Sequence, residues 1–255
     1  MSTYKADDGT LINYEQFSEP SSRENLLLLP GLIGSISSQW RQFVPSLTPQ
    51  YRVILADLRG HGHSENKAPN LMPERMMHDI IGLLDSLHID QVHVAGYSLG
   101  GYLGLLLHLN QPRRVQTLLM HATKYYWNEE SVKKMGSQLD PDALSEKVPQ
   151  YANQLAQEHG SRWRKLVRQA AELVHHTWKD GLTENMVSQT QCPVLVSVGD
   201  RDELVQIPEA LRLSRIIRLG ELIVLPGVKH PFKSIRAVPL VPMMQSFHHA
   251  PDKRT

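Results

Sequence analysis

The sequence predicts an α/β protein with a mostly parallel sheet and a helical insertion, because short apolar runs alternate with longer segments of helical period. Six runs are apolar at nearly every position, which is typical of buried strands that helices cover on both faces. They are residues 26–29, 53–56, 92–95, 115–120, 194–198 and 222–225. Two further stretches, residues 2–6 and 10–17, predict an antiparallel hairpin at the edge of the sheet.

Helices are expected between these strands. Residues 73–87 present a broad apolar face, and residues 99–111 form a second apolar segment that Pro112 ends. Strands of this kind, joined by such helices, predict a doubly wound sheet with helices packed on both of its faces.

A long polar segment interrupts the alternation of strands and helices. It is rich in Lys, Glu, Gln and Arg, and within it residues 141–158 and 162–178 each predict a helix. Ligands of open α/β sheets bind at the carboxyl ends of the strands, so an insertion at this point is expected to cover the site. The expected domains are a core of residues 1–123 and 192–255 and a helical cap of residues 124–191.

The composition is that of an ordinary globular protein, with 41% hydrophobic and 21% charged residues in a chain of 255. Lys and Arg number 27 against 26 Asp and Glu, so the net charge of +1 provides no field to attract nucleic acid or an acidic membrane. The single cysteine, Cys192, excludes an internal disulfide. The first residues lack the features of a secretory signal, and no apolar run approaches the ~20 residues that cross a bilayer. We therefore expect a cytoplasmic protein, monomeric or homodimeric.

A strand, a tight turn and a helix surround Ser98. The turn matches the pattern G-x-S-x-G, follows an apolar run and opens an apolar helix; it reads Gly96-Tyr97-Ser98-Leu99-Gly100. Glycines are needed on both sides because a Cβ would collide with the neighbouring strand and helix. The serine then lies at the positive end of the helix, and the N–H of Leu99 is free to bind an oxyanion. A turn serine without a catalytic role would match the same pattern, so the partners of Ser98 decide its role.

A serine hydroxyl needs a base to become a nucleophile, and the chain offers 13 histidines. Of these, His230 follows the last expected strand, in a loop that can reach the strand ends. The acid is expected after the preceding strand, where Asp200 and Asp202 both stand. We favour Asp202 as the group that orients the imidazole, because it lies three residues after the strand-ending glycine, and we expect Asp200 to brace the loop.

A second oxyanion donor is expected in the loop after residues 26–29. Gly31 lets the backbone turn so that the next N–H points into the site, which makes Leu32 the expected donor beside Leu99. Tight backbone geometry, rather than a side chain, would stabilise the oxyanion.

Aromatic residues suggest where a substrate would bind. Tyr97 stands beside the nucleophile, and Tyr125, Tyr126 and Trp127 stand where the chain enters the insertion. All four are candidate substrate-binding residues. For the last three, packing between cap and core is an equal alternative.

With these residues in view, the chain resembles the α/β-hydrolase superfamily over nearly its whole length apart from the insertion. The residues that carry the resemblance are Pro30-Gly31 with Trp40, the segment from Asp57 to Ser64, the turn around Ser98, Gly199-Asp200-Arg201-Asp202, and His230. The resemblance implies an α/β-hydrolase fold with catalytic residues in the order Ser, Asp, His. Two departures alter the walls of the site: Pro30 stands where many relatives have His, and Lys229 where Gly is frequent.

A metal or cofactor is not expected. His61 and His63 lie two residues apart, but such a pair without further ligands is poor evidence for zinc. The resemblance also implies that both belong to a structural turn.

With serine as the nucleophile, we predict a hydrolase that cleaves small or medium carboxylic esters, with lactones and thioesters as variants. The enzymatic alternatives are carbon–carbon bond hydrolysis of a diketone and the elimination catalysed by a menaquinone-pathway synthase. The synthase is less favoured because the helix after the turn around Ser98 lacks the arginine expected for a polyanionic substrate; its sequence there is Gly101-Tyr102-Leu103-Gly104. The alternative from another class is a ligand receptor that keeps the triad and acts by binding.

Overall fold

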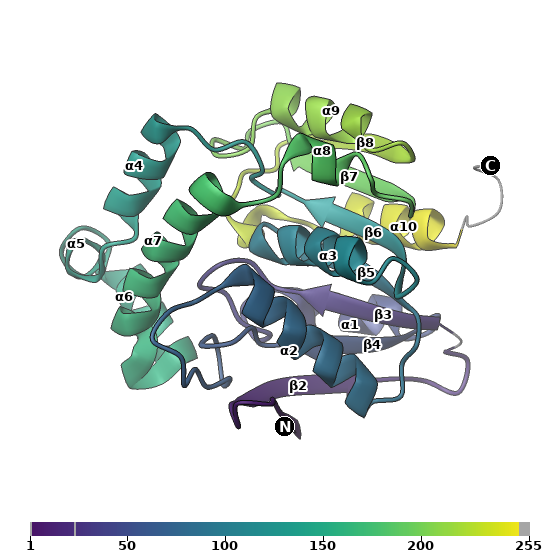
Figure 1. Cartoon of the computed structure of the whole chain (residues 1–255), viewed down its shortest axis with the longest axis horizontal. Coiled ribbons are helices and arrows are strands. Elements are labelled where there is room, and N and C mark those ends of the chain that lie inside the picture. The colour runs from purple at the N-terminus through teal and green to yellow at the C-terminus, as the bar shows by residue number, and fades with distance from the viewer. Residues whose placement is uncertain (1, 23, 250–255) are drawn as a thin grey trace.

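The computed structural model describes residues 2–22 and 24–249. Within these residues the centre of the fold is an eight-stranded sheet in the order β1-β2-β4-β3-β5-β6-β7-β8. β2 is antiparallel to both β1 and β4, and the other neighbouring pairs are parallel. The strands are β1 (Ser2–Lys5), β2 (Leu11–Phe17), β3 (Glu24–Leu29), β4 (Tyr51–Ala56), β5 (Val92–Tyr97), β6 (Val115–His121), β7 (Val194–Gly199) and β8 (Gly220–Leu225) (Figure 1).

Helices cover both faces of this sheet (Figure 1). Alternate residues of β3 show why: Leu27 and Leu29 belong to one buried cluster, whereas Leu26 and Leu28 belong to another on the opposite face. The predicted doubly wound α/β fold is confirmed. The first cluster includes residues of α2 (Pro73–Ser86), α3 (Leu99–Asn110) and α9 (Ile207–Ile216), and the second includes residues of α1 (Val44–Leu47) and α10 (Ala237–His248).

Between β6 and β7 the chain forms helices that extend beyond the carboxyl ends of the parallel strands (Figure 1). Helices α4 to α7 enclose an apolar cluster of their own, which includes Leu139, Leu155 and Val167. In contrast, α8 packs against α3, and its Val187 belongs to the core cluster. The helices are α4 (Glu129–Gln138), α5 (Pro141–Lys147), α6 (Pro149–His159), α7 (Trp163–Asp180) and α8 (Glu184–Val187).

The prediction of a single helix over residues 141–158 is wrong, because two helices occupy this segment. Val148 separates them with a φ of −139° and a ψ of 58°. The reason is Pro149, since proline disfavours a helical conformation in the residue before it.

No helix in the described residues is both long enough and apolar enough to cross a membrane.

The last strand also differs from expectation. β8 forms the edge of the sheet, so Leu222 and Ile223 are half-buried and Val224 is 36% exposed. Its apolar run is typical of a central strand, but no further strand covers its outer side in the described residues.

Candidate active site

Ser98 stands on the turn between β5 and α3, and its backbone is strained. Its φ of 50° and ψ of −113° lie in a region that residues with a side chain rarely adopt. A Cβ on Gly96 would lie 2.2 Å from the carbonyl carbon of Gly100, and a Cβ on Gly100 would lie 2.2 Å from the carbonyl oxygen of Leu29. Glycine is therefore required on both sides, and the turn presents the serine at the carboxyl ends of the strands.

His230 and Asp202 follow β8 and β7 and form a hydrogen-bonded pair. The imidazole Nδ1 is 2.9 Å from Oδ2 and 3.1 Å from Oδ1 of Asp202. The buried Oδ1 also accepts the N–H groups of Leu204 and Val205, each at 2.8 Å. Burial raises the pKa of Asp202, but the hydrogen bond and charge of His230, together with these N–H groups, hold it below its usual range. The ionised carboxylate occupies Nδ1 and leaves Nε2 as the available ring nitrogen.

Asp200, the rival acid, has a different partner. Its Oδ1 accepts the N–H of Gly227 at 2.6 Å. It thus ties the loop after β7 to the loop that leads to His230, and the structure places Asp202 rather than Asp200 against the imidazole.

Tyr97 holds the backbone of the loop that contains His230 and Phe232. Its hydroxyl donates to the carbonyl of His230 at 2.7 Å, and its ring meets that of Phe232 with centroids 5.0 Å apart. Burial raises the pKa of Tyr97, so its hydroxyl stays protonated and remains a donor. Tyr97 also lines the cavity, as expected, but its polar contact is with the protein backbone.

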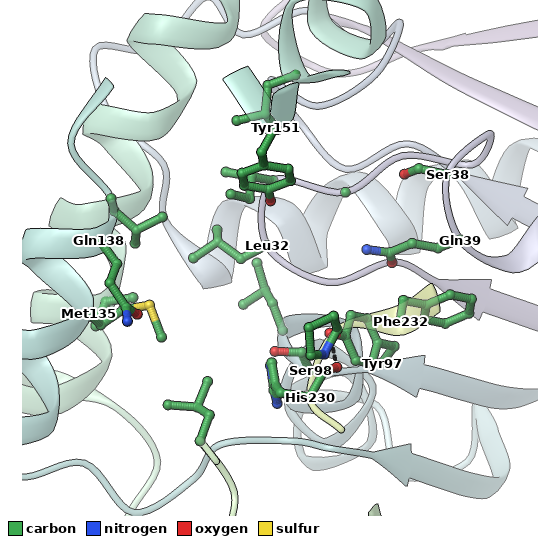
Figure 2. A pocket seen from close by; sticks show the side chains of 18 of the residues that line it. Leu32, Ser38, Gln39, Tyr97, Ser98, Met135, Gln138, Tyr151, His230 and Phe232 are labelled. Carbon is green, nitrogen blue, oxygen red and sulfur yellow. Dashed lines mark hydrogen bonds between the residues drawn. The ribbon is translucent and has the colours of Figure 1, made fainter. Parts of the chain in front are cut away.

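Ser98 and His230 lie side by side in the wall of the cavity (Figure 2). Among the hydrogen bonds of the described residues, none joins their two side chains. Catalytic hydrogen bonds of this kind are often long before a substrate binds and shorten in the complex. The arrangement therefore brings the three residues Ser98, Asp202 and His230 together, in the chain order that the sequence predicted.

The loop after β3 lies directly against Ser98. A Cβ on Gly31 would lie 3.2 Å from the Cβ of Ser98, so the two backbones approach closely. Gln39 holds this loop, because its Oε1 accepts the N–H of Gly31 at 2.8 Å. The N–H groups of Leu32 and Leu99 donate no hydrogen bond within the described part of the chain, and both residues line the cavity. Two unpaired donors thus flank the serine.

A cavity of about 750 Å³ lies between the strand ends and the cap. Figure 2 shows Met135 and Tyr151 on the opposite side of this space from Ser98. The wall that the cap provides is mostly apolar; its apolar members include Trp127, Met135, Leu139, Leu144, Leu155, Leu173 and Val174.

Of the aromatic residues at the cap entrance, Trp127 lines the cavity, but Tyr125 and Tyr126 do not. The hydroxyl of Tyr125 donates to the carbonyl of Leu182 at 2.8 Å, and that of Tyr126 donates to Oε1 of Glu184 at 2.6 Å. These contacts favour packing between cap and core, the alternative that the sequence left open for both tyrosines. Both side chains pack the start of the insertion against its end, where their hydroxyls form these hydrogen bonds.

Sequence reasoning missed His159, at the end of α6. Its Nδ1 accepts the N–H of Gly62 at 2.8 Å, so Nε2 carries the proton and donates to the carbonyl of Ile33 at 3.0 Å. Burial lowers the pKa of His159 and keeps the imidazole neutral. His159 therefore ties the cap to the loop that contains Leu32. No local signal marks it, because its partners lie far away in the sequence.

His121, at the end of β6, was also missed. Its ring stacks on Tyr97 with centroids 6.1 Å apart, and its Nδ1 lies 2.9 Å from Oγ of Ser197. Burial lowers the pKa of His121 to about 4, so it is neutral beneath the site at physiological pH.

The turn after β4 braces the loop that carries Leu32. Asp57 accepts the N–H of Ile36 at 2.7 Å through Oδ1 and the N–H of His63 at 2.9 Å through Oδ2. His61 is buried, with Nδ1 2.9 Å from the carbonyl of Arg59. In the described residues, no group of three or more His, Cys, Asp or Glu side chains is placed to hold a metal ion.

Comparison with known proteins agrees with this geometry. A family model described as the alpha/beta hydrolase fold matches residues 24–165, more than half of the chain. The serine hydrolase BPHL of Mus musculus is 25% identical over 234 residues, which cover 88% of this chain and 78% of that protein. The relative 3-oxoadipate enol-lactonase 1 of Acinetobacter baylyi is 28% identical over 117 residues, 46% of this chain and 44% of that enzyme.

The fold is also found among solved structures. The crystal structure of the enol-lactonase from Burkholderia xenovorans LB400 superposes with a TM-score of 0.81 at 20% identity, over 96% of this chain and 99% of that one. The chain therefore belongs to the α/β-hydrolase family and is a hydrolase of that fold.

Proposed function

We propose that the protein hydrolyses carboxylic esters with a small or medium acyl group, lactones and thioesters included, through an acyl-enzyme on Ser98. The observation that carries the proposal is the strained turn that sets Ser98 beside His230, between the unpaired N–H groups of Leu32 and Leu99. This set of groups matches what acyl transfer requires, namely a nucleophile, a base and donors for an oxyanion.

The proposed reaction begins when Nε2 of His230 takes the proton of the Ser98 hydroxyl as the oxygen attacks the ester carbonyl. Asp202 holds the Nδ1 proton and stabilises the imidazolium that forms. The N–H groups of Leu32 and Leu99 bind the oxyanion, and the imidazolium then protonates the leaving alcohol. In the second half, His230 deprotonates water, which attacks the acyl-enzyme and releases the acid.

The test is a panel of p-nitrophenyl esters of graded acyl length, assayed on the wild type and on Ser98→Ala. The wild type should hydrolyse at least one short or medium ester with many turnovers. Ser98→Ala should lower the rate of this hydrolysis at least about ten-thousandfold. Unchanged activity in Ser98→Ala would refute the mechanism.

The same assay separates the alternatives. A receptor would release one equivalent of p-nitrophenol at most and retain its ligand, whereas an enzyme turns over repeatedly. The synthase alternative stays less favoured, because the described cavity wall contains no arginine for a polyanionic substrate.

A further inference from the structure

Charged groups are scarce in the cavity wall. Apart from the proposed base His230, the charged residues that line it in the described chain are Lys124, Glu158 and Lys233. The other lining groups are apolar or neutral. A substrate carboxylate buried here would need a cationic partner, because an ionised group removed from water without one is strongly disfavoured.

The carboxylate of Glu158 is already engaged. Its Oε2 accepts the hydroxyl of Ser35 at 2.8 Å, and its Oε1 accepts the amide of Gln154 at 2.7 Å. Lys233 is exposed at the protein surface, so water surrounds its ammonium group. Glu158 is an anion and Lys233 is solvated, so neither residue provides a desolvated cation for a bound ester.

Lys124 is the buried cation of the wall, and its charge is neutralised. The Lys124 side chain is 8% exposed, and Nζ donates to both carboxylate oxygens of Glu209, at 2.8 and 2.7 Å. Glu209 lies in the first turn of α9 and is not part of the cavity wall. The carboxylate thus holds the ammonium from outside the cavity, and a substrate anion would have to displace it.

We propose that the cavity selects esters whose acyl and alcohol parts are both uncharged, and that the Lys124–Glu209 pair sets this selectivity by holding the one buried ammonium of the described cavity wall. The inference rests on the proposed ester hydrolysis and names the substrate class of that site. It also makes Glu209 a residue that determines specificity without touching the substrate.

The first experiment compares two esters of equal acyl length, p-nitrophenyl hexanoate and mono-p-nitrophenyl adipate. The second differs by a carboxylate in place of the terminal methyl group. The wild type should have a kcat/KM for the neutral ester that is at least about a hundredfold higher, since the described cavity wall offers the carboxylate no desolvated cation that is unpaired.

The second experiment frees the ammonium. Glu209→Gln should raise kcat/KM for the adipate ester relative to the hexanoate ester by about tenfold, the effect of one charge-assisted hydrogen bond. Lys124→Met combined with Glu209→Gln should abolish this gain. Glu172→Gln, which removes the same charge from an exposed position on α7, should leave the ratio as in the wild type.

The outcomes distinguish this inference from the proposed function. Equal turnover of the two esters by the wild type, lost in Ser98→Ala, would overturn the selectivity and leave ester hydrolysis standing. An unchanged ratio in Glu209→Gln would overturn the role of the ion pair. If neither ester is hydrolysed through Ser98, the proposed function and this inference fall together.

Discussion

The loops at the carboxyl ends of the strands and the helical cap are held in place differently. In the loops, backbone segments touch so closely that Gly100 has no room for a Cβ beside Leu29. The cap packs around its own apolar cluster and also meets the core loops through polar contacts, such as His159 to Ile33 and Arg162 to the carbonyl of Gly62. We infer that substitutions in the core loops change the reaction itself, whereas most substitutions in the cap change what the site admits.

The largest effect is expected in the core loops, at the acid. Asp202→Asn should lower kcat by about ten-thousandfold, because an amide no longer holds the imidazole in the tautomer that deprotonates serine. Asp200→Asn keeps an Oδ1 that can accept the N–H of Gly227 and loses only the charge, so it should cost less than about tenfold. Steady-state kinetics on one ester measure both variants, and a larger loss for Asp200→Asn would reverse the assignment of the acid.

In the cap, Met135→Trp should change selectivity rather than chemistry. Met135 is half-buried on α4 and lines the cavity, so an indole there shortens the space for an acyl chain. The ratio of kcat/KM for octanoyl over acetyl esters should fall by about a hundredfold, since each lost methylene site contributes to binding. The matched control is Gly136→Ala, where an added Cβ meets nothing within 4 Å. A fall of equal size on both esters would contradict the division between cap and core.

His159 is the cap residue expected to alter the reaction, because it donates to the carbonyl of Ile33, next to Leu32. His159→Gln retains a donor near the position of Nε2, whereas His159→Asn retains an acceptor near Nδ1. We expect His159→Asn to lower kcat by about tenfold with little change in KM, and His159→Gln to preserve most of kcat. Equal losses in the two variants would mean that His159 serves stability alone.

The smallest effect is in the pH dependence of stability. The pKa of Asp202 is lower in the folded chain, so its contribution is complete above the unfolded value of about 3.9 and disappears as pH falls through the folded value. Between about pH 5 and pH 2, the free energy of unfolding should decrease more for the wild type than for Asp202→Asn. Urea titrations measure this difference, and Gly136→Ala should follow the wild type. Parallel curves for wild type and Asp202→Asn would contradict the assigned shift.

The sequence predicts the groups whose geometry depends on near neighbours. The turn around Ser98 follows from Gly96 and Gly100, and the loop at Leu32 follows from Gly31, because backbone sterics act over a few residues. The break at Val148 was also visible in principle, in the proline that follows it. Chain order then places Asp202 and His230 after successive strands.

Other features depend on which distant segments meet. The edge position of β8, the contact of His159 with Ile33 and the pair of Lys124 with Glu209 join residues that no local pattern relates. Tyr126 shows the same limit of local patterns. An aromatic residue at the cap entrance is compatible with a pocket wall and with packing between cap and core, and only the hydrogen bond of its hydroxyl to Glu184 distinguishes the two.

The sequence by itself therefore determined the sheet, the strained serine turn and the chain order of the three proposed catalytic residues, because apolar periodicity and backbone sterics act locally. The tertiary structure alone decided which cap side chains face the cavity, which residue anchors the loop at Leu32 and how the charge of Lys124 is neutralised. Those outcomes depend on long-range packing, in which a side chain takes whichever partner the fold brings within reach.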